Sequence, residues 1–448
     1  MILSIFPLLI FIILLLRNER HGIIAAIIID VLIPKAITLG SMSILNIALS
    51  ILFLFYLIKF FSKRKVRKTI FEFPAKKPLQ ILIFSLFIVT LANSFFGFQD
   101  LITEILKRFL FGLLIWISFN KEEDTSKMFK VLGILFIVIA LYGFIGTITN
   151  SNPYIEYIDK HYSTDDVDFI HYYDAEVREN TTRTTRSQSF FNHPIRYGGH
   201  LALVVPFVVS FLLLETKKRK KFFYFILMSL LIIGIITSNS RSPILQLMIS
   251  LIVLFLLIKP RDKFTVISSS TVLLFLSLPA FPFFAAYSST IGSLFEMLSG
   301  DTSSSIGGSS IEMRLNQLKA AYSIFIESPI FGRGIGATAV LDTDKSISFR
   351  TLAALHGDES FLFQQMITTG LVGIIAYTLF FGVLISSLLK LRNHCFDKKS
   401  IYLLNSAVAS TAGYIILILA TGELDTFYFY FILMCLTIRT VYNINLKN

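Results

Sequence analysis

The stretch that organises the chain is IEMRLNQLKAAYSIFIESPIFGRGIGATAVLDTDKSISFRTLAALHGDESFLFQQMITTGLVGII, residues 311–375. Polar, charged and glycine-rich residues here run directly into an apolar segment of membrane length. Apolar side chains recur at steps of three and four residues at its start, which predicts an amphipathic helix near 311–328. Pro329 should end that helix, and the glycines of GRGIG (332–336) predict a turn that is not helical.

The second half of this stretch leads into the next predicted helix. Asp358, Glu359 and Ser360 stand at its expected start, where short acceptors cap free backbone N–H groups and carboxylates suit the helix dipole. We expect this unit to carry the chemistry of the protein, on the non-cytoplasmic face of a membrane.

Composition assigns the whole chain to a membrane. Of its 448 residues, 54% are apolar and 45 are phenylalanine, and the mean hydropathy is +0.71. Unbroken apolar runs of about 15–20 residues predict an all-α polytopic membrane protein, because in lipid each segment must satisfy its own backbone hydrogen bonds. Transmembrane β-strands would alternate apolar and polar residues instead. The segment 1–16 lacks a basic flank and a small-residue cleavage site, so we expect a retained helix and not a signal peptide.

We predict about 12–13 transmembrane helices in a single integral membrane domain, residues 1–448. Two long polar loops interrupt them, at 149–196 and 286–358, and the second contains the amphipathic helix and lies between two late spans. The sequence shows no internal repeat and no soluble domain. The predicted spans are 1–16, 23–38, 43–61, 79–96, 101–119, 129–148, 197–214, 222–237, 243–258, 264–285, 360–389, 401–420 and 427–442.

The formal net charge of +12 lies mostly in short loops, so it indicates orientation in a membrane and not a nucleic-acid partner. The positive-inside rule assigns these basic loops to the cytoplasm. Both long polar loops and the connection 238–242 (SNSRS) then fall on the outer face, away from ATP and nucleotide sugars. The basic loops are 17–21, 62–77, 120–127, 217–221, 259–263 and 390–399.

Arg241 is a candidate phosphate-binding residue. It lies in TSNSRSP (237–243), between two apolar spans, where an arginine is costly unless it pairs or lines a cavity. Pro243 and the neighbouring serines break the helix and leave free N–H groups beside the guanidinium, a combination suited to phosphate. The alternative is an interfacial arginine that contacts lipid headgroups.

Other basic side chains are candidates for the same role. Arg314 begins the amphipathic helix and Arg333 lies within the glycine turn, and each is otherwise a solvated surface charge. His193 and Arg196 lie in SFFNHPIRYGGH (189–200), just above a span and near the level of Arg241.

His356, Asp358 and Glu359 are candidates for a general base at the mouth of the following span, because a carboxylate or imidazole can take a proton from an incoming hydroxyl. A helix N-cap is the alternative role for Asp358. The two cysteines, Cys395 and Cys435, have the spacing of neither a metal site nor a disulfide. GRGIGA (332–337) follows no predicted strand and lies on the outer face, which excludes a dinucleotide site.

Four blocks of the sequence resemble the O-antigen ligase/polymerase superfamily of bacterial polysaccharide assembly. Together they cover roughly residues 190–390, and their order and spacing are more specific than any single block. The blocks are SFFNHPIRYGGHLALVVPF (189–207), SNSRSPILQLMISLIVLFLL (238–257), MRLNQLKAAYSIFIESPIFGRGIGA (313–337) and HGDESFLFQQMITTGLVGIIAYTLFF (356–381).

This resemblance implies glycan transfer from an undecaprenyl-pyrophosphate carrier at the outer, periplasmic face of the bacterial inner (cytoplasmic) membrane. It implies a lipid-linked glycan donor and acceptor and a chain-length regulator as partners within the lipid bilayer. No nucleotide sugar, metal or other cofactor is implied.

Carried over residue by residue, Arg241 and Arg314 match arginines of the family blocks, where basic residues hold the pyrophosphate. The usual histidine of the last block falls at Asp358, counting back from Leu362, with His356 two residues earlier, so either is a candidate for the base. The departure favours an O-antigen or capsular polysaccharide polymerase, with an O-antigen ligase that transfers glycan to lipid A–core as the alternative. A lipid-linked oligosaccharide flippase would predict two similar halves and charges deep in several spans, and neither is found.

Overall fold

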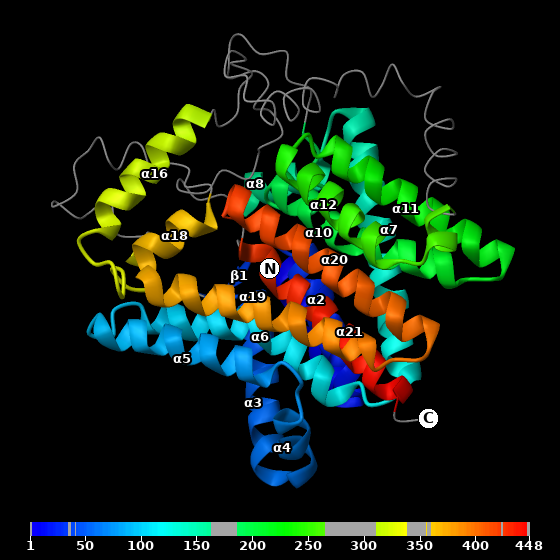
Figure 1. Cartoon of the computed structure of the whole chain (residues 1–448), viewed down its shortest axis with the longest axis horizontal. Coiled ribbons are helices and arrows are strands. Elements are labelled where there is room, and N and C mark those ends of the chain that lie inside the picture. Colours follow the sequence, from blue (N-terminus) through cyan, green and yellow to red (C-terminus); the bar gives the residue numbers. More distant parts are fainter. Residues whose placement is uncertain are drawn as a thin grey trace.

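The computed structural model describes residues 2–34, 37–40, 42–162, 186–264, 311–337, 355, 360–422 and 424–445. Nearly all of these residues are helical (Figure 1), which confirms the prediction of an all-α polytopic membrane protein. The elements are α1 (Ile2–Arg17), α2 (Glu19–Leu32), β1 (Thr38–Leu39), β2 (Met42–Ser43), α3 (Ile44–Ser62), α4 (Arg64–Phe71), α5 (Lys76–Ala92), α6 (Phe98–Ser118), α7 (Glu122–Thr149), α8 (Pro153–Tyr162), α10 (Pro194–Leu214), α11 (Lys218–Thr237), α12 (Arg241–Leu257), α16 (Ile311–Phe325), α18 (Phe361–Thr368), α19 (Gly370–Asn393), α20 (Lys398–Thr421), the 3₁₀ turn η3 (Leu424–Thr426) and α21 (Phe427–Asn445).

Each predicted span that falls within the described residues overlaps a helix, although the span predicted at 23–38 continues past the end of α2 into β1. Among those residues, seven helices are long and apolar enough to cross a membrane, or eight if α4 and α5, which meet at 89°, form one bent span. The predicted total of about 12–13 also includes shorter helices such as α1 and α12 and the more charged α6. The span predicted at 264–285 lies almost wholly outside the described residues, as do residues 163–185 of the loop at 149–196 and most of the loop at 286–358.

The span predicted at 360–389 is two helices, α18 and α19, and not one. Gly370 begins α19 with a φ of +60°, a left-handed value. The glycine turn at 332–336 docks into this break, and two of its backbone N–H groups donate to the carbonyl oxygens of Ile367 and Thr368 at 2.8 and 2.9 Å. The carbonyl groups at the break are therefore satisfied by a distant segment, which local sequence cannot reveal.

The helix predicted near 311–328 is present as α16, which ends at Phe325, before Pro329. Its predicted apolar face is not a buried one, because Leu315, Leu318 and Tyr322 are exposed whereas Gln317 is buried. The predicted glycine turn is also confirmed, because its three glycines have φ values of +61°, +101° and +89°. The basic segment 62–77, predicted as a loop, contains the exposed helix α4.

The centre of the bundle is formed by α10, α20 and α21. Between 72% and 83% of the residues in the apolar windows of these three helices are buried, against 33–44% in α3, α7, α11 and α19. Small hydroxyl side chains allow α10 and α20 to approach each other closely. Ser406 Oγ donates to the Pro206 carbonyl oxygen, and Ser410 Oγ donates to that of Leu203, both at 2.8 Å.

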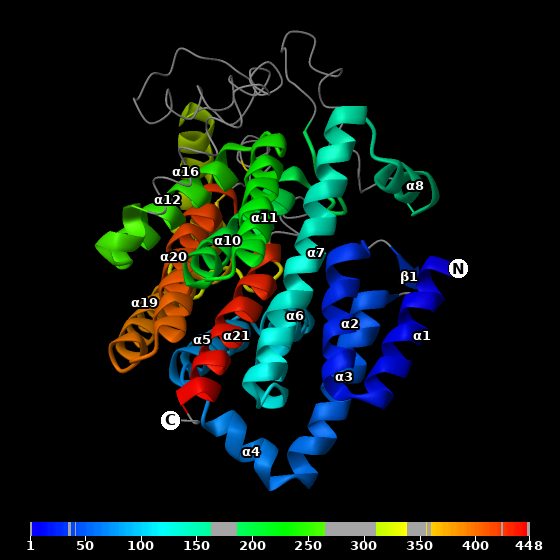
Figure 2. The ribbon, with the colours of Figure 1, turned by 90° about the vertical axis from the view of Figure 1, so that its right-hand side faces the viewer.

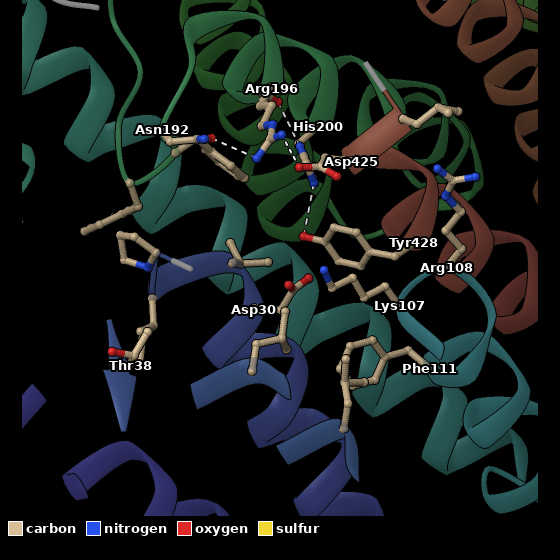
Figure 3. A pocket seen from close by; sticks show the side chains of 18 of the residues that line it. Asp30, Thr38, Lys107, Arg108, Phe111, Asn192, Arg196, His200, Asp425 and Tyr428 are labelled. Carbon is tan, nitrogen blue, oxygen red and sulfur yellow. Dashed lines mark hydrogen bonds and ion pairs between the residues drawn. The ribbon is translucent and has the colours of Figure 1, made fainter. Parts of the chain in front are cut away.

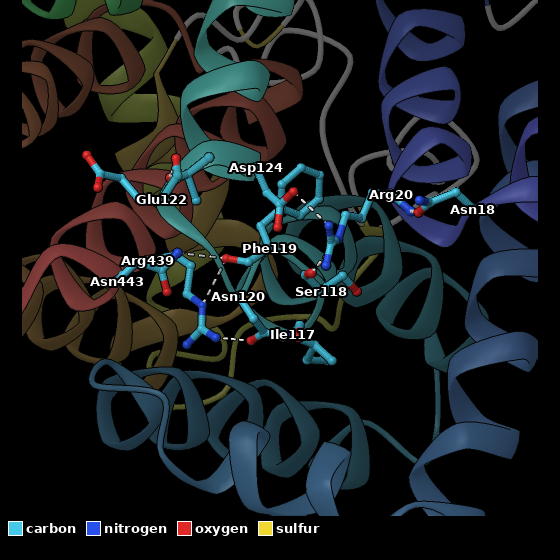
Figure 4. Close-up of polar contacts among 11 residues, drawn as sticks. Asn18, Arg20, Ile117, Ser118, Phe119, Asn120, Glu122, Asp124, Arg439 and Asn443 are labelled. Atoms are coloured by element: carbon cyan, nitrogen blue, oxygen red, sulfur yellow. Dashed lines mark hydrogen bonds and ion pairs between the residues drawn. The ribbon is translucent and has the colours of Figure 1, made fainter. Parts of the chain in front are cut away.

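Four of the predicted basic loops meet at one end of the bundle, the basic end (Figure 2). Arg20 of the α1–α2 turn pairs with Asp124 at 2.7 Å and donates from Nε to the Ser118 carbonyl oxygen at 2.9 Å (Figure 4). Lys399 pairs with Glu122 at 2.9 Å, and its neighbour Lys398 pairs with Asp262 at 3.6 Å. Loops 17–21, 120–127, 259–263 and 390–399 are thus joined by direct contacts.

The polar segments predicted on the opposite face also meet, at the other end of the bundle. Arg186 donates to Ser240 Oγ at 2.7 Å, and the Ser187 N–H donates to the Thr237 carbonyl oxygen at 2.9 Å. The Tyr154 hydroxyl of α8 donates to the Leu32 carbonyl oxygen of α2. Burial raises the pKa of this phenol, so it remains a neutral donor. The described part of the 149–196 loop therefore joins the 238–242 connection at one end.

Candidate functional site

A cavity of about 730 Å³ opens at the end of the bundle opposite the basic end (Figure 3). It lies between α2, α3, α6, α8, the start of α10 and the start of α21. Its polar lining is made by Asp30, Thr38, Glu104, Lys107, Arg108, His161, Asn192, Arg196, His200, Asp425 and Tyr428.

The N-terminus of α10 places Arg196 on the cavity wall. His193 is the N-cap residue, and its Nδ1 accepts from the Ile195 N–H at 3.1 Å. Pro194 follows at the first helical position, where its missing N–H costs nothing. One turn into the helix, the Arg196 guanidinium donates to Asn192 Oδ1 at 2.9 Å and forms an ion pair with Asp425.

His200, one turn further along α10, connects this arginine to α21. Its ring is buried, with Nδ1 2.8 Å from the Arg196 carbonyl oxygen and Nε2 3.2 Å from the Tyr428 hydroxyl. Because a carbonyl oxygen only accepts, Nδ1 must carry a proton. A neutral His200 ring can therefore accept the Tyr428 hydroxyl proton at Nε2.

The facing wall carries charged groups from α2 and α6. The Asp30 carboxyl and the Lys107 ammonium group both point toward Tyr428 (Figure 3). Arg108 forms an ion pair with Glu104 and donates to the Tyr377 hydroxyl at 2.7 Å. Both members of this ion pair line the cavity. Charges at membrane depth persist only where partners or water stabilise them, so their concentration here makes this cavity the candidate functional site.

The lining suits a ligand with many hydroxyl groups. Three cationic side chains (Lys107, Arg108 and Arg196) and three carboxylates (Asp30, Glu104 and Asp425) line the cavity together with amide, hydroxyl and imidazole groups. The volume is within the range of small-molecule sites. Aromatic rings at Phe190 and Phe191 add apolar surface. Within the described residues, no group of three His, Cys, Asp or Glu side chains is placed to hold a metal ion.

Residues from two of the family blocks form hydrogen bonds with the C-terminal end of α20. Arg314 of α16 donates to the Ala420 carbonyl oxygen at 2.8 Å, and Ser360 Oγ donates to that of Leu419 at 3.0 Å. These are last-turn carbonyl groups, which lack helical partners and carry the negative end of the dipole. Gly422, with a φ of +65°, closes the helix, and Asp425 with its Arg196 partner follows three residues later.

Arg241 is the first residue of α12, on the side of α10 that faces α12 and α20. Its neighbour Ser240 is the N-cap and accepts from Arg186. Two residues on, Pro243 packs so closely on Gly198 that a Cβ there would lie 2.8 Å from the proline ring. The α12 N-terminus therefore lies against the first turns of α10. Of the predicted phosphate-binding residues, all of which are described, only Arg196 lines the cavity itself.

Arg333 is placed elsewhere. Its turn docks on the α5–α6 connection, where the Asn93 amide donates to the Phe331 carbonyl oxygen at 3.5 Å, and its guanidinium pairs with Glu327. His193 has an observed capping role. A phosphate-binding role for either residue stays a prediction.

The predicted bases His356, Asp358 and Glu359 lie outside the described residues. Their described neighbours on both sides are anchored: Leu355 packs in a small core with α16, and Ser360 bonds to α20. Ser360, and not Asp358, is the N-cap residue of α18.

Sequence reasoning missed three residues of the cavity: Asp30, Asp425 and Tyr428. Asp30 is the one carboxylate in the span predicted at 23–38, which is itself a signal. Asp425 lies in a short loop between two predicted spans, where a carboxylate is ordinary. Tyr428 gives no local signal, because an aromatic residue in a transmembrane helix is ordinary.

Comparison with protein families finds a match in the second half of the chain. Residues 226–378 match the family model described as O-antigen ligase. The matched segment includes Arg241, Arg314 and Arg333, and it confirms the resemblance to the O-antigen ligase/polymerase superfamily. No curated protein matches the chain.

Proposed function

We propose, from this match to the O-antigen ligase family, that the protein is a membrane glycosyltransferase that polymerises polysaccharide. It joins oligosaccharide repeat units carried on undecaprenyl pyrophosphate into O-antigen or capsular polysaccharide, at the outer face of the cytoplasmic membrane. One observation carries the proposal: Arg314, Ser360 and the Arg196–Asp425 pair all converge on residues 419–425, beside a cavity lined by three cationic and three acidic side chains.

The reaction is a substitution at the anomeric carbon of the donor. The acceptor hydroxyl attacks C1 from the face opposite the diphosphate, the C1–O bond breaks, and undecaprenyl diphosphate leaves with the bonding electrons. Arg241 and Arg314 stabilise the charge that grows on the leaving diphosphate. Asp358 or His356 takes the acceptor proton. The anomeric configuration inverts because a single displacement occurs on the face opposite the leaving group. The energy comes from the sugar–diphosphate bond, and the step requires no metal, nucleotide or other cofactor.

The cavity is proposed to hold the sugar residues next to the reacting bond. Asn192, Lys107 and Tyr428 offer the directional hydrogen bonds that sugar hydroxyl groups require, and Phe190 and Phe191 offer apolar faces. Arg196 stands between this cavity and the end of α20, so we assign it to donor positioning. A chain-length regulator is the expected protein partner.

Substitution of the two arginines tests the mechanism. Arg241→Ala and Arg314→Ala should each lower the rate of chain extension by about 100-fold, the usual effect of removing one fixed donor to developing charge. Arg219→Ala, an exposed arginine at the basic end, is the matched control and should leave extension unchanged. The readout is the polysaccharide ladder in cells that contain equal amounts of each variant in the membrane. Unchanged ladders in the Arg241→Ala strain would refute its role.

An O-antigen ligase is the alternative, because the matched family model carries that description. A strain lacking the protein separates the possibilities by what accumulates. Single repeat units on the carrier in the outer leaflet support a polymerase, and complete chains that never reach lipid A support a ligase. Repeat units confined to the inner leaflet would indicate a flippase and contradict both.

A further inference from the structure

A second hollow, which we name the basal groove, runs along the surface of the bundle toward the basic end. It has a volume of about 1070 Å³ and lies between α1, α2 and the start of α7. We propose that the basal groove binds one anionic glycerophospholipid of the leaflet at the basic end. Its lining is Phe6, Pro7, Ile10, Leu14, Arg17, Asn18, Arg20, His21, Ile24, Ala25, Ile28, Ile29, Leu32, Ile33, Phe119, Asp124, Lys127, Lys130 and Val131.

The lining is divided in the way that an amphiphile requires. Side chains from the bodies of α1 and α2 are almost all apolar, and they provide a wall for acyl chains. The charged side chains gather at one end, where Arg17 and His21 of the α1–α2 turn face Lys127 and Lys130 of α7. These cations come from two segments about 100 residues apart in sequence, so the fold assembles the cluster.

The length of the apolar part matches one leaflet. From Phe6 to Arg17, α1 rises about 16 Å at 1.5 Å per residue. Half of a typical hydrocarbon core is about 15 Å. A phospholipid whose phosphate lies at Arg17 would therefore have its acyl chains along the groove as far as the bilayer midplane.

The cluster retains excess positive charge. The one carboxylate in the lining, Asp124, is neutralised by Arg20, whose Nε also donates to the Ser118 carbonyl oxygen (Figure 4). Among the described residues, Arg17, Lys127 and Lys130 form no ion pair with a carboxylate, and all three are exposed. Lys59 and Lys399 at the same end are paired with glutamates. The groove therefore presents its cations to a ligand, and a phosphodiester supplies the complementary charge.

The occupant differs from the proposed carrier lipid in orientation. A carrier lipid whose diphosphate reaches the 730 Å³ cavity would place its charge near Asp30, at the end of α2 away from the basic end. The cations of the basal groove instead require a phosphate at the basic end. This inference does not depend on the proposed glycosyl transfer.

Lipid binding to the purified full-length protein tests the proposal. Native mass spectrometry with added phosphatidylglycerol, phosphatidylcholine or undecaprenyl phosphate measures the apparent affinity for each lipid. We expect phosphatidylglycerol to bind most tightly, and the Lys127→Gln/Lys130→Gln variant to bind it about tenfold more weakly. The matched control is Lys218→Gln/Lys221→Gln, which removes the same charge from exposed positions at the same end but outside the groove, and it should change the affinity less than twofold.

A second variant examines the acyl part without changing charge. Ile28→Trp narrows the apolar wall and should weaken phosphatidylglycerol binding, while thermal unfolding in detergent verifies that each variant is folded. Equal losses in the two lysine variants would overturn the proposal, because the effect would then be general surface electrostatics. Equal affinity for phosphatidylcholine, or tighter binding of undecaprenyl phosphate, would overturn it as well.

Discussion

At the scale of single residues, the ion pair between Arg196 and Asp425 predicts that a substitution of either residue affects the other. Asp425→Asn removes the ion-pair partner of a guanidinium that is only 20% exposed, next to the buried His200. We expect this substitution to lower the free energy of unfolding by about 1–2 kcal/mol, because Asp425 itself is 36% exposed and the pair is partly solvated. We also expect loss of chain extension. Thermal unfolding in detergent and polysaccharide ladders measure the two effects.

Asp425→Glu is the control, because it keeps the charge and should retain most of the activity. Arg196→Gln should cause a loss similar to that of Asp425→Asn, and the double variant should lose little more than either single one. Additive losses would mean that the two residues act separately, and the positioning role of Asp425 would be wrong.

The sequence predicted Arg196 as a site residue but did not indicate its ion-pair partner, Asp425, and the reason is physical. An arginine beside a span is conspicuous, since an isolated cation near lipid is unfavourable. A carboxylate in a short outer loop is unremarkable until the fold sets it against α10. The same holds for the Asp30–Tyr428 side of the cavity, which needs α2 and α21 to be adjacent.

At the scale of elements, the break between α18 and α19 is held by backbone contacts that tolerate no side chain. A Cβ at Gly370 would lie 2.6 Å from the Ile330 carbonyl oxygen, and its φ of +60° is strained for other residues. Gly370→Ala should therefore lower the free energy of unfolding by roughly 1–3 kcal/mol. Thermal unfolding in detergent measures this change, and ladders should shorten because Ser360 and α16 are positioned through α18.

Gly382→Ala, on the same helix, is the matched control. A Cβ added at this position would have no atom within 4 Å, so alanine there should be neutral or stabilising by about 0.5–1 kcal/mol. If both variants were equally stable, the docked glycine turn would not be what holds the break.

Hydropathy alone predicted where the helices lie, but it did not predict the break between α18 and α19. An apolar run predicts burial or lipid contact along its length, and residues 360–389 are apolar almost throughout. The interruption arises because backbone N–H groups from residues more than 30 positions away compete for the carbonyl groups of α18. Local periodicity carries no information about such a competitor.

At the scale of the whole molecule, the two ends of the bundle differ as the loop charges predicted. Contacts join the basic loops at one end, and the Arg186–Ser240 and Arg314–Ala420 bonds lie at the other. Which end faces the cytoplasm is a prediction of the positive-inside rule and is not shown by the contacts. The proposed reaction requires the cavity end to face the outer compartment. That compartment lacks nucleotides, so the energy must come from the lipid-linked donor.

Cysteine labelling in intact cells decides the orientation. In a background without native thiols (Cys395→Ser/Cys435→Ala), a membrane-impermeant maleimide should label Tyr157→Cys on α8, a position 46% exposed. Phe396→Cys, 99% exposed in the basic loop before α20, should react only after the membrane is permeabilised. The unaltered protein should label slowly under both conditions, since both native thiols are buried and burial raises the pKa of Cys395 and so lowers its thiolate fraction at neutral pH. Labelling of Phe396→Cys before permeabilisation would place the basic loops outside, and the cavity that holds Arg196 would then face the nucleotide-containing compartment.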